Sequence, residues 1–440
     1  MASSTATVFR IPDEITEYAL TFLHPLDIAN FSQTCHLAYA LVYGAPDQYL
    51  WRQLFLAHPF DDPRNTLDYQ NTSISYNWRA GLQQRVQAEL IAFNIAHRLD
   101  EQHLALETLI SVIGDASPVP STLEHKESDS IKWVTRILLD SKILDAHVAV
   151  PGPTDNQLVS RIRTYLALSF ERASNDETTA RLGALRTRSR CLVYDLRNYR
   201  RDNDYGPFLC GGQINWVQAE AIVNVIQTNL IDLHGVWMDT RPPVGLEATR
   251  TYSVTGAANR LSADWACVEG TWRRYVCFMD YRDLFAFNYS SNSRGTRDPS
   301  FFDDPNFQEA TRLIELKLHL VPVTSIPHNH VFISPRKSSR SPRFPDLYFS
   351  GTSNGINGNE ATVKGSVSMG SDGVVRWRFA SIYDGYTQWS SEGIQVGSVG
   401  SAAGIIGAWT GATHDHGDPV GPFWLWKVPD HHPSHMSDPN

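Results

Sequence analysis

Residues 363–369 (VKGSVSM) alternate between apolar and polar side chains, and residues 375–379 (VRWRF) alternate again after the pair Asp372-Gly373. Such alternation is typical of a strand that buries one face, because successive side chains point to opposite sides of a sheet. Asp-Gly between two such segments predicts a hairpin, since the turn requires positive φ. A second pair, Asp384-Gly385, follows. The stretch therefore predicts an antiparallel up-and-down sheet that ends in the aromatic-rich segment 421–426.

Strand patterns recur on both sides of this hairpin. We predict about nine strands, at residues 272–278, 284–287, 313–320, 346–350, 361–369, 374–383, 387–397, 404–410 and 422–428. An up-and-down sheet of this length exposes two edges unless its first and last strands pair. A closed barrel is therefore favoured over an open sheet.

Composition and charge restrict the classes of function. The chain has 440 residues, enough for two or three domains, and a net charge of −9 from 38 basic and 47 acidic residues. An excess of acid disfavours nonspecific nucleic-acid binding, which needs clustered Lys and Arg. Five cysteines without a Cys-x-x-Cys pair favour a reducing compartment. No apolar run reaches the roughly 18 residues of a membrane helix. We expect a cytoplasmic or nuclear protein without nucleic-acid or membrane partners.

The N-terminal segment, residues 9–57, predicts three short helices. Apolar residues at helical spacing begin at Ile15, Ile28 and Leu50, and Pro12 suits a first helical turn. Three helices of this length bury little surface by themselves. They either pack on the rest of their own chain or bind a partner, and the pattern alone leaves both alternatives open.

These segments resemble an F-box. The resemblance rests on residues 11–15 (IPDEI), 25–36 (PLDIANFSQTCH) and 50–52 (LWR). The chain departs from the family pattern at Ile11, which replaces Leu, and at His36, which replaces a basic residue and has no Trp three residues later. The resemblance implies docking on the Skp adaptor of a Skp–cullin–F-box ubiquitin ligase. The residues it implies for this contact are Pro12, Ile15, Leu23, Pro25, Leu26, Ile28, Phe31, Leu50 and Trp51.

The middle of the chain, residues 58–243, predicts a helical linker domain. Helical patterns cover residues 84–113, 131–144, 158–170, 184–196 and 217–233. Residues 199–204 between two of them predict a charged loop. The overlapping segment 203–208 is interpreted as a surface connection, with a binding loop as the alternative. We expect this domain to act as a rigid spacer. The tail, residues 429–440, is expected to be disordered.

The C-terminal domain, residues 244–428, resembles a calycin barrel. Gly270-Thr271-Trp272 at the start of the predicted barrel is similar to the Gly-x-Trp of lipocalin-like proteins. Segments 377–379, 382–385, 388–393 and 421–427 resemble fungal F-box proteins of this layout. The resemblance implies an α+β multidomain receptor whose barrel recognises a protein substrate, including cyclin-type degrons.

Aromatic and polar residues near the end of the barrel are the candidate substrate contacts. Aromatic side chains are frequent binding hot spots, and the loop before the last strand is expected at the barrel mouth. The candidates are Trp377, Trp389, Trp409, His414, Asp415, His416, Asp418 and Phe423. The basic segment 336–343 is interpreted as a solvated loop, with capture of an acidic or phosphorylated degron as the alternative.

Catalytic and metal chemistry receive little support from the sequence. The pairs His414/His416 and His328/His330 could each share a metal, but no third ligand follows at fixed spacing. No Gly-x-Ser-x-Gly segment indicates a hydrolase. We therefore predict a non-catalytic chain without metal or cofactor.

The leading interpretation is the substrate-recognition subunit of a Skp–cullin–F-box ubiquitin ligase. Its expected partners are a Skp-family adaptor, a cullin scaffold, and a protein substrate that is phosphorylated or carries a C-terminal degron. The alternative is a calycin-like small-molecule-binding protein with a helical interaction module at its N-terminus. An enzyme that uses the histidine-rich loops ranks last.

Overall fold

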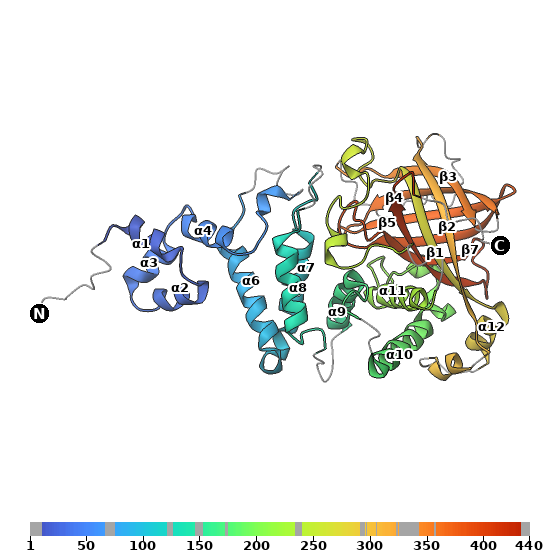
Figure 1. Cartoon of the computed structure of the whole chain (residues 1–440), viewed down its shortest axis with the longest axis horizontal. Coiled ribbons are helices and arrows are strands. Elements are labelled where there is room, and N and C mark those ends of the chain that lie inside the picture. Colours follow the sequence, from blue (N-terminus) through green and yellow to red (C-terminus); the bar gives the residue numbers. More distant parts are fainter. Residues whose placement is uncertain are drawn as a thin grey trace, which may run out of the picture. The chain divides into compact units, whose positions relative to one another are not determined.

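The structure is a computed structural model, and it places the chain in two compact units (Figure 1). Unit 1 comprises residues 1–118 and 126–155, and unit 2 comprises residues 119–125 and 156–440. The structure describes residues 11–66, 75–120, 126–145, 153–171, 175–233, 240–290, 295, 297–304, 306–322, 324, 343–355 and 358–432.

Unit 1 begins with four short helices rather than the predicted three. They are α1 (Asp13–Leu20), α2 (Pro25–Ser32), α3 (His36–Tyr43) and α4 (Tyr49–Ala57). The second predicted helix divides at Cys35, whose extended backbone (φ −164°, ψ 168°) interrupts the helix and begins α3. The Cys35 sulfur accepts a hydrogen bond from the Ala38 N–H at 3.5 Å. The helical spacing of Ile28, Phe31 and Cys35 predicts a single helix through this position, whereas Cys35 is the N-cap of α3.

These four helices share a small core. Ile28, Leu50 and Leu54 are each at most 1% exposed. The Trp51 indole N–H donates to the Val42 carbonyl oxygen at 3.1 Å, which joins α4 to α3. Burial of these side chains positions the helices. The exposed apolar side chains that remain available to a partner lie on α1 and α2 and also on α3, where Leu37 and Tyr39 are 56% and 57% exposed.

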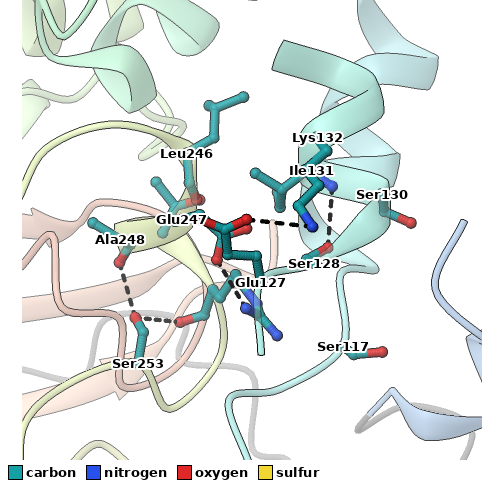
Figure 2. A network of polar contacts seen from close by, with 12 residues as sticks. Ser117, Glu127, Ser128, Ser130, Ile131, Lys132, Leu246, Glu247, Ala248 and Ser253 are labelled. Carbon is teal, nitrogen blue, oxygen red and sulfur yellow. Dashed lines mark hydrogen bonds and ion pairs between the residues drawn. The ribbon is translucent and has the colours of Figure 1, made fainter. Parts of the chain in front are cut away.

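The rest of unit 1 is helical. It contains η2 (Pro63–Asn65), α6 (Trp78–Phe93), η3 (Ile95–His97), η4 (Leu99–Glu101), α7 (Gln102–Gly114) and α8 (Asp129–Asp140). Ser128 caps α8 by accepting the Ile131 N–H at 3.0 Å, and an ion pair joins Lys132 to Glu127 at 3.3 Å in the same segment (Figure 2).

Asp61 connects three segments of unit 1. Its carboxylate accepts the Ser117 N–H at 2.8 Å, the Ser128 hydroxyl at 2.6 Å and the Asp129 N–H at 2.9 Å. Its own N–H donates to the Ser130 hydroxyl oxygen at 2.9 Å. The Asp61 side chain therefore links the segment before α6 to the loop after α7 and to the start of α8.

Unit 2 contains a barrel with helices on its outside (Figure 1). Its helical segments are α9 (Pro153–Leu166), α10 (Asp176–Val193), η5 (Leu196–Asn198), η6 (Arg201–Asn203), α11 (Trp216–Ile231), η8 (Leu246–Thr249), η9 (Ala257–Asn259), α12 (Tyr281–Tyr289) and η10 (Pro299–Asp303). Helix α11 packs against β1, β7 and β8. On the outside of β1 the Asn229 side-chain amide of α11 donates to the Cys277 sulfur at 3.5 Å.

The barrel has eight antiparallel strands in chain order and closes by pairing of β8 with β1. The strands are β1 (Gly270–Met279), β2 (Glu309–Leu320), β3 (Leu347–Gly355), β4 (Glu360–Met369), β5 (Val375–Tyr383), β6 (Tyr386–Gln395), β7 (Ile405–Gly411) and β8 (Val420–Val428). The predicted closed up-and-down barrel is confirmed.

One predicted strand is wrong. Residues 284–287 lie in helix α12, not in a strand. The Asp280 carboxylate accepts the Arg282 N–H at 2.8 Å and starts the helix, in which Leu284 and Phe287 are buried. Two buried residues three positions apart fit a helix better than a strand.

One half of the barrel interior is filled by side chains. Trp272, Phe349 and Trp377 are each at most 1% exposed, and the Trp272 indole N–H donates to the Val268 carbonyl oxygen at 2.8 Å. Trp265 belongs to the same core and lies in the segment that leads into β1. The filled half therefore lies toward the start of β1, and the space described below lies toward its end.

Candidate functional site

A cavity of about 420 Å³ lies inside the other half of the barrel; we call it the barrel cavity. Its lining comes from the end of β1, the start of β2 and the matching ends of five further strands. The lining residues are Arg274, Val276, Phe278, Met279, Asp280, Tyr281, Arg312, Ile314, Ser353, Ser381, Tyr383, Trp389, Trp409, Pro419 and Val420. A cavity of this size, with apolar walls and a few polar groups, is typical of a binding site.

Arg274 is the most unusual residue of the barrel cavity. The residue is 5% exposed, and its guanidinium lies over the rings of Phe379 at 5.0 Å and Phe423 at 4.5 Å. One Nη donates to the Ser391 hydroxyl oxygen at 2.8 Å, and Nε has no hydrogen-bond partner. No Asp or Glu among the residues that the structure describes forms an ion pair with Arg274.

Burial changes the chemistry of this guanidinium. Loss of water contact lowers the pKa of Arg274 to about 9, and the neighbouring Tyr383 acts in the opposite direction. The side chain is still a cation at neutral pH. A buried cation without an anion raises the free energy of the folded state. An anionic ligand that pairs with Arg274 would offset this cost, so Arg274 is the position in the cavity at which an anion would bind most favourably.

Aromatic side chains form the wall above Arg274. Trp389 and Trp409 meet edge to face with ring centroids 5.2 Å apart, and the Trp409 indole N–H donates to the Cys277 carbonyl oxygen at 3.1 Å. Gly421 permits this arrangement, because a Cβ at this position would overlap the Cys277 carbonyl oxygen and crowd the Trp409 ring. The wall is therefore held in place by the backbones of β1 and β8.

A second pocket of about 420 Å³ lies next to the barrel cavity, and Val420 lines both. We call it the arginine pocket, because four arginines line it and only two aspartates. Its charged and polar lining comprises Arg197, Arg200, Arg201, Arg297, Asp415, Asp418, Tyr199, Tyr205, Tyr289, Asn288, Thr410, His414 and His416. These residues come from η5 and η6, from α12 and the segment after it, and from the loop between β7 and β8.

Asp195 holds two of the four arginines. Its carboxylate accepts both Nε and Nη2 of Arg197, at 2.9 and 2.5 Å, which raises the pKa of Arg197. It also lies 3.6 Å from Nε of Arg297, an 8% exposed residue whose Nη2 donates to the Asn288 side-chain oxygen at 3.4 Å. One carboxylate therefore balances two guanidinium groups.

The loop between β7 and β8 also lines the arginine pocket, and a ring contact joins it to Tyr205. The rings of Tyr205 and His414 stack at 3.6 Å, and both residues have positive φ, 57° and 54°. Burial lowers the pKa of His414, Arg378 lowers it further, and Asp418 acts in the opposite direction. Positive φ is uncommon outside glycine, and it occurs here on both partners of one contact.

The structure divides the predicted substrate-binding residues into three groups. Trp389 and Trp409 line the barrel cavity. The four polar residues, His414, Asp415, His416 and Asp418, line the arginine pocket. Trp377 and Phe423 are 0% exposed and belong to the filled interior, so their side chains support the site and do not reach a ligand in this state.

The predicted docking residues of α1 to α4 also divide by burial. Ile15, Leu23 and Leu26 are 56%, 42% and 39% exposed, Pro12 is exposed and Phe31 is half-buried. The others lie in the core: Pro25, Ile28, Leu50 and Trp51. Phe22, which is 72% exposed, was not predicted and extends the same exposed set.

The arginines of both pockets were missed from the sequence. Arg274 occupies an inward position of an alternating strand, and a charged residue at such a position is a signal that could have found it. The predicted charged loop 199–204 and the predicted surface connection 203–208 supply Arg200, Arg201 and Tyr205 to the arginine pocket. The basic segment 336–343, apart from Arg343, lies outside the described residues, as does the pair His328/His330.

No group of three or more His, Cys, Asp or Glu side chains that could hold a metal ion occurs among the described residues. None of the helices in the described ranges is long and apolar enough to cross a membrane.

Comparisons of the chain with protein-family models, curated proteins and solved structures find no match.

Proposed function

We propose that this chain is the substrate-recognition subunit of a Skp–cullin–F-box ubiquitin ligase. The observation that carries the proposal is the exposed apolar surface of α1 and α2, formed by Ile15, Tyr18, Phe22, Leu23 and Leu26, which are 39–72% exposed. Contiguous exposed apolar side chains mark surfaces that bind other proteins. These residues lie within the segment whose sequence resembles an F-box, so a Skp-family adaptor is the partner that we propose for them.

The barrel would hold the substrate. The sequence of Gly270-Thr271-Trp272 at the start of β1 and the closed eight-stranded barrel support a calycin-like domain. The chain itself would make and break no bonds. It would raise the effective concentration of substrate lysines near a charged ubiquitin-conjugating enzyme that the cullin scaffold brings.

The barrel cavity suits a C-terminal degron. A polypeptide C-terminus combines a carboxylate with a side chain, and the cavity offers the buried cation Arg274 beside the aromatic residues Trp389 and Trp409. Pairing with an anion would offset the cost of burying Arg274. We therefore propose that the last residue of the substrate enters the barrel cavity and that its carboxylate pairs with Arg274.

Co-purification with a Skp-family adaptor tests the docking surface. We expect the wild-type chain to co-purify and the double variant Phe22→Asp, Leu26→Asp to lose about tenfold or more in affinity, because two apolar contacts become charged. Leu139→Asp is the matched control, since Leu139 is a 58% exposed apolar residue of α8 in the same unit. Failure of the wild-type chain to co-purify would refute the ligase proposal.

The volume of the barrel cavity favours a second candidate function, binding of a small molecule. About 420 Å³ of space inside a barrel also fits an apolar carboxylic acid. The two functions differ in which carboxylate binds. A peptide library with free C-termini should bind, and its amidated counterpart should not, if the cavity reads a degron. Binding of decanoic acid without binding of either library would instead support the small-molecule carrier.

A further inference from the structure

The basic residues of this chain are mostly arginines. Lysine accounts for 7 of the 38 basic residues, and none lies in residues 1–125 or 143–316. Lysine is otherwise among the commonest residues of globular domains. At an exposed position its ammonium carries the same charge as a guanidinium. The scarcity of lysine therefore needs a physical reason other than charge or solubility.

The side chains around the two pockets show the same preference for arginine. Six arginines line the barrel cavity and the arginine pocket, whereas no lysine is among the described residues that line them. Arg200 and Arg201 are exposed and make no ion pair within the described part of the chain. The side chain of Arg282, next to the cavity residue Tyr281, is 91% exposed and contacts Asp280 through Nε at 3.2 Å. None of these three positions uses the bidentate geometry that distinguishes arginine from lysine.

The lysines that unit 2 does contain lie elsewhere on the barrel. Lys317 on β2 and Lys427 on β8 are paired with the start of β1, which is the filled half. The Lys427 ammonium also donates to the Cys267 carbonyl oxygen at 3.2 Å. Lys364 is half-buried on β4, and Lys337 lies outside the described residues. The described surface around both pockets is therefore cationic but carries no amine.

Lysine and arginine differ in one respect that matters for a ubiquitin ligase. A lysine ε-amine attacks the thioester carbon that joins ubiquitin to its conjugating enzyme. A C–N bond forms, the C–S bond breaks, and the released thiol takes up the proton that the amine loses. A small fraction of lysine side chains is unprotonated at neutral pH, because their pKa is about 10.4. A guanidinium stays protonated in proteins and cannot attack.

We propose that the arginines around the two pockets protect this chain from ubiquitination by its own ligase. This inference rests on the proposed function. A substrate in the barrel cavity and the receptor side chains beside it are brought together to the charged conjugating enzyme. An amine on the receptor at this place would share the high effective concentration of the substrate lysines. With arginine at these positions, the bound substrate supplies the acceptor amines.

A charge-conserving variant tests the proposal. Arg200→Lys, Arg201→Lys and Arg282→Lys, combined in one chain, add three amines beside the pockets and keep the net charge of −9. The full chain is assembled with the adaptor, the cullin and its RING subunit, and is supplied with activating enzyme, conjugating enzyme, ubiquitin and ATP. Mass spectrometry should find ubiquitin on the three introduced amines. Modification of the chain should be about threefold faster or more than in the wild type.

A glutamine variant separates the amine from the charge. Arg200→Gln, Arg201→Gln and Arg282→Gln remove the same guanidinium groups and add no amine, so the wild-type rate of modification should persist. All three side chains are exposed, and equal melting temperatures would exclude misfolding of either variant. Discharge of the charged conjugating enzyme to free lysine checks that each assembly is active.

Three outcomes would overturn the proposal. They are introduced amines that stay unmodified in an active assembly, equal rates for the lysine variant and the wild type, and a glutamine variant modified as fast as the lysine variant. Co-purification with the adaptor is scored separately from these rates. An assembled and active ligase with any of these outcomes refutes the protection alone, whereas failure to assemble refutes the ligase proposal and this inference with it.

Discussion

At the scale of single residues, Arg274 differs from most of the other buried arginines that the structure describes. Arg273, one position before Arg274 on β1, points outward and pairs with Glu315 at 2.5 Å. Arg190 on α10 likewise pairs with Glu309 at 2.6 Å. The fold supplies carboxylates for these cations, whereas no carboxylate among the described residues pairs with Arg274. Arg85 is also buried without an ion pair to a described residue, but it donates to the Tyr76 hydroxyl and Gly81 carbonyl oxygens, each at 3.1 Å. This contrast makes Arg274 a candidate for function rather than for stability.

Replacing Arg274 by methionine should separate these two roles. Arg274→Met keeps a long side chain over Phe379 and Phe423 but removes a buried charge, so the free energy of unfolding should be unchanged or higher by about 1 kcal/mol or more. Binding of free C-termini should be lost. Thermal unfolding and peptide titration measure the two effects, and Arg282→Met is the exposed control. A clear fall in the melting temperature would show that Arg274 is structural.

His414 should make stability depend on pH in a defined direction. Its pKa is lowered in the folded chain, chiefly by burial, whereas an unfolded histidine has a pKa of about 6.5. Below this pH the unfolded state binds more protons than the folded state, so the free energy of unfolding falls as the pH falls. His414→Asn removes the titrating group and tolerates positive φ, and it should flatten this dependence between about pH 5 and 7.

The measurement for His414 is the melting temperature across that pH range. His97→Asn, which removes an exposed histidine of unit 1, is the control and should keep the wild-type slope. An unchanged slope in His414→Asn would contradict the prediction. Weaker thermal stability at all pH values alone would report only the loss of the ring contact with Tyr205.

At the scale of elements, Asp61 is the residue on which the helices of unit 1 depend most visibly. Its carboxylate accepts hydrogen bonds from three backbone N–H groups and the Ser128 hydroxyl, from segments far apart in sequence. Asp61→Ala leaves these donors without a partner and should lower the free energy of unfolding of unit 1 by about 2–4 kcal/mol. Chemical denaturation measures this change.

The control for Asp61 is another acidic residue of the same unit. Asp100 is exposed, and Asp100→Ala should change the free energy of unfolding by about 0.5 kcal/mol or less. A similar loss in both variants would mean that the charge, and not the hydrogen-bond network, carries the effect. Asp61→Asn, which can still accept hydrogen bonds but carries no charge, should lie between the two.

The elements differ in how well the sequence alone predicts them. The alternating segments and the two Asp-Gly turns predicted β4, β5 and β6 closely, because strand periodicity and turn chemistry are local properties. Segment 284–287 became part of a helix because Asp280 caps it, a signal that four residues read alone do not contain. The arginine pocket brings together residues of segment 196–205, the residues Asn288, Tyr289 and Arg297, and residues of segment 410–420, and no local pattern indicates that they meet.

At the scale of the whole molecule, units 1 and 2 supply different parts of the proposed function. The exposed apolar side chains that we propose for the adaptor belong to unit 1, and both pockets belong to unit 2. Each activity can therefore be removed without the other: Phe22→Asp with Leu26→Asp acts on the first, and Arg274→Met acts on the second.

Pairing of β1 with β8 has a consequence for biosynthesis. Thr271 meets Val428 across that seam, so the ribosome must translate nearly the whole C-terminal domain before the seam can form. Until then the nascent chain exposes an unpaired edge of β1 that other chains can pair with. Contacts so distant in sequence also form slowly. We therefore expect the nascent chain to depend on chaperones during translation, because the first and last strands of the barrel pair only at the end.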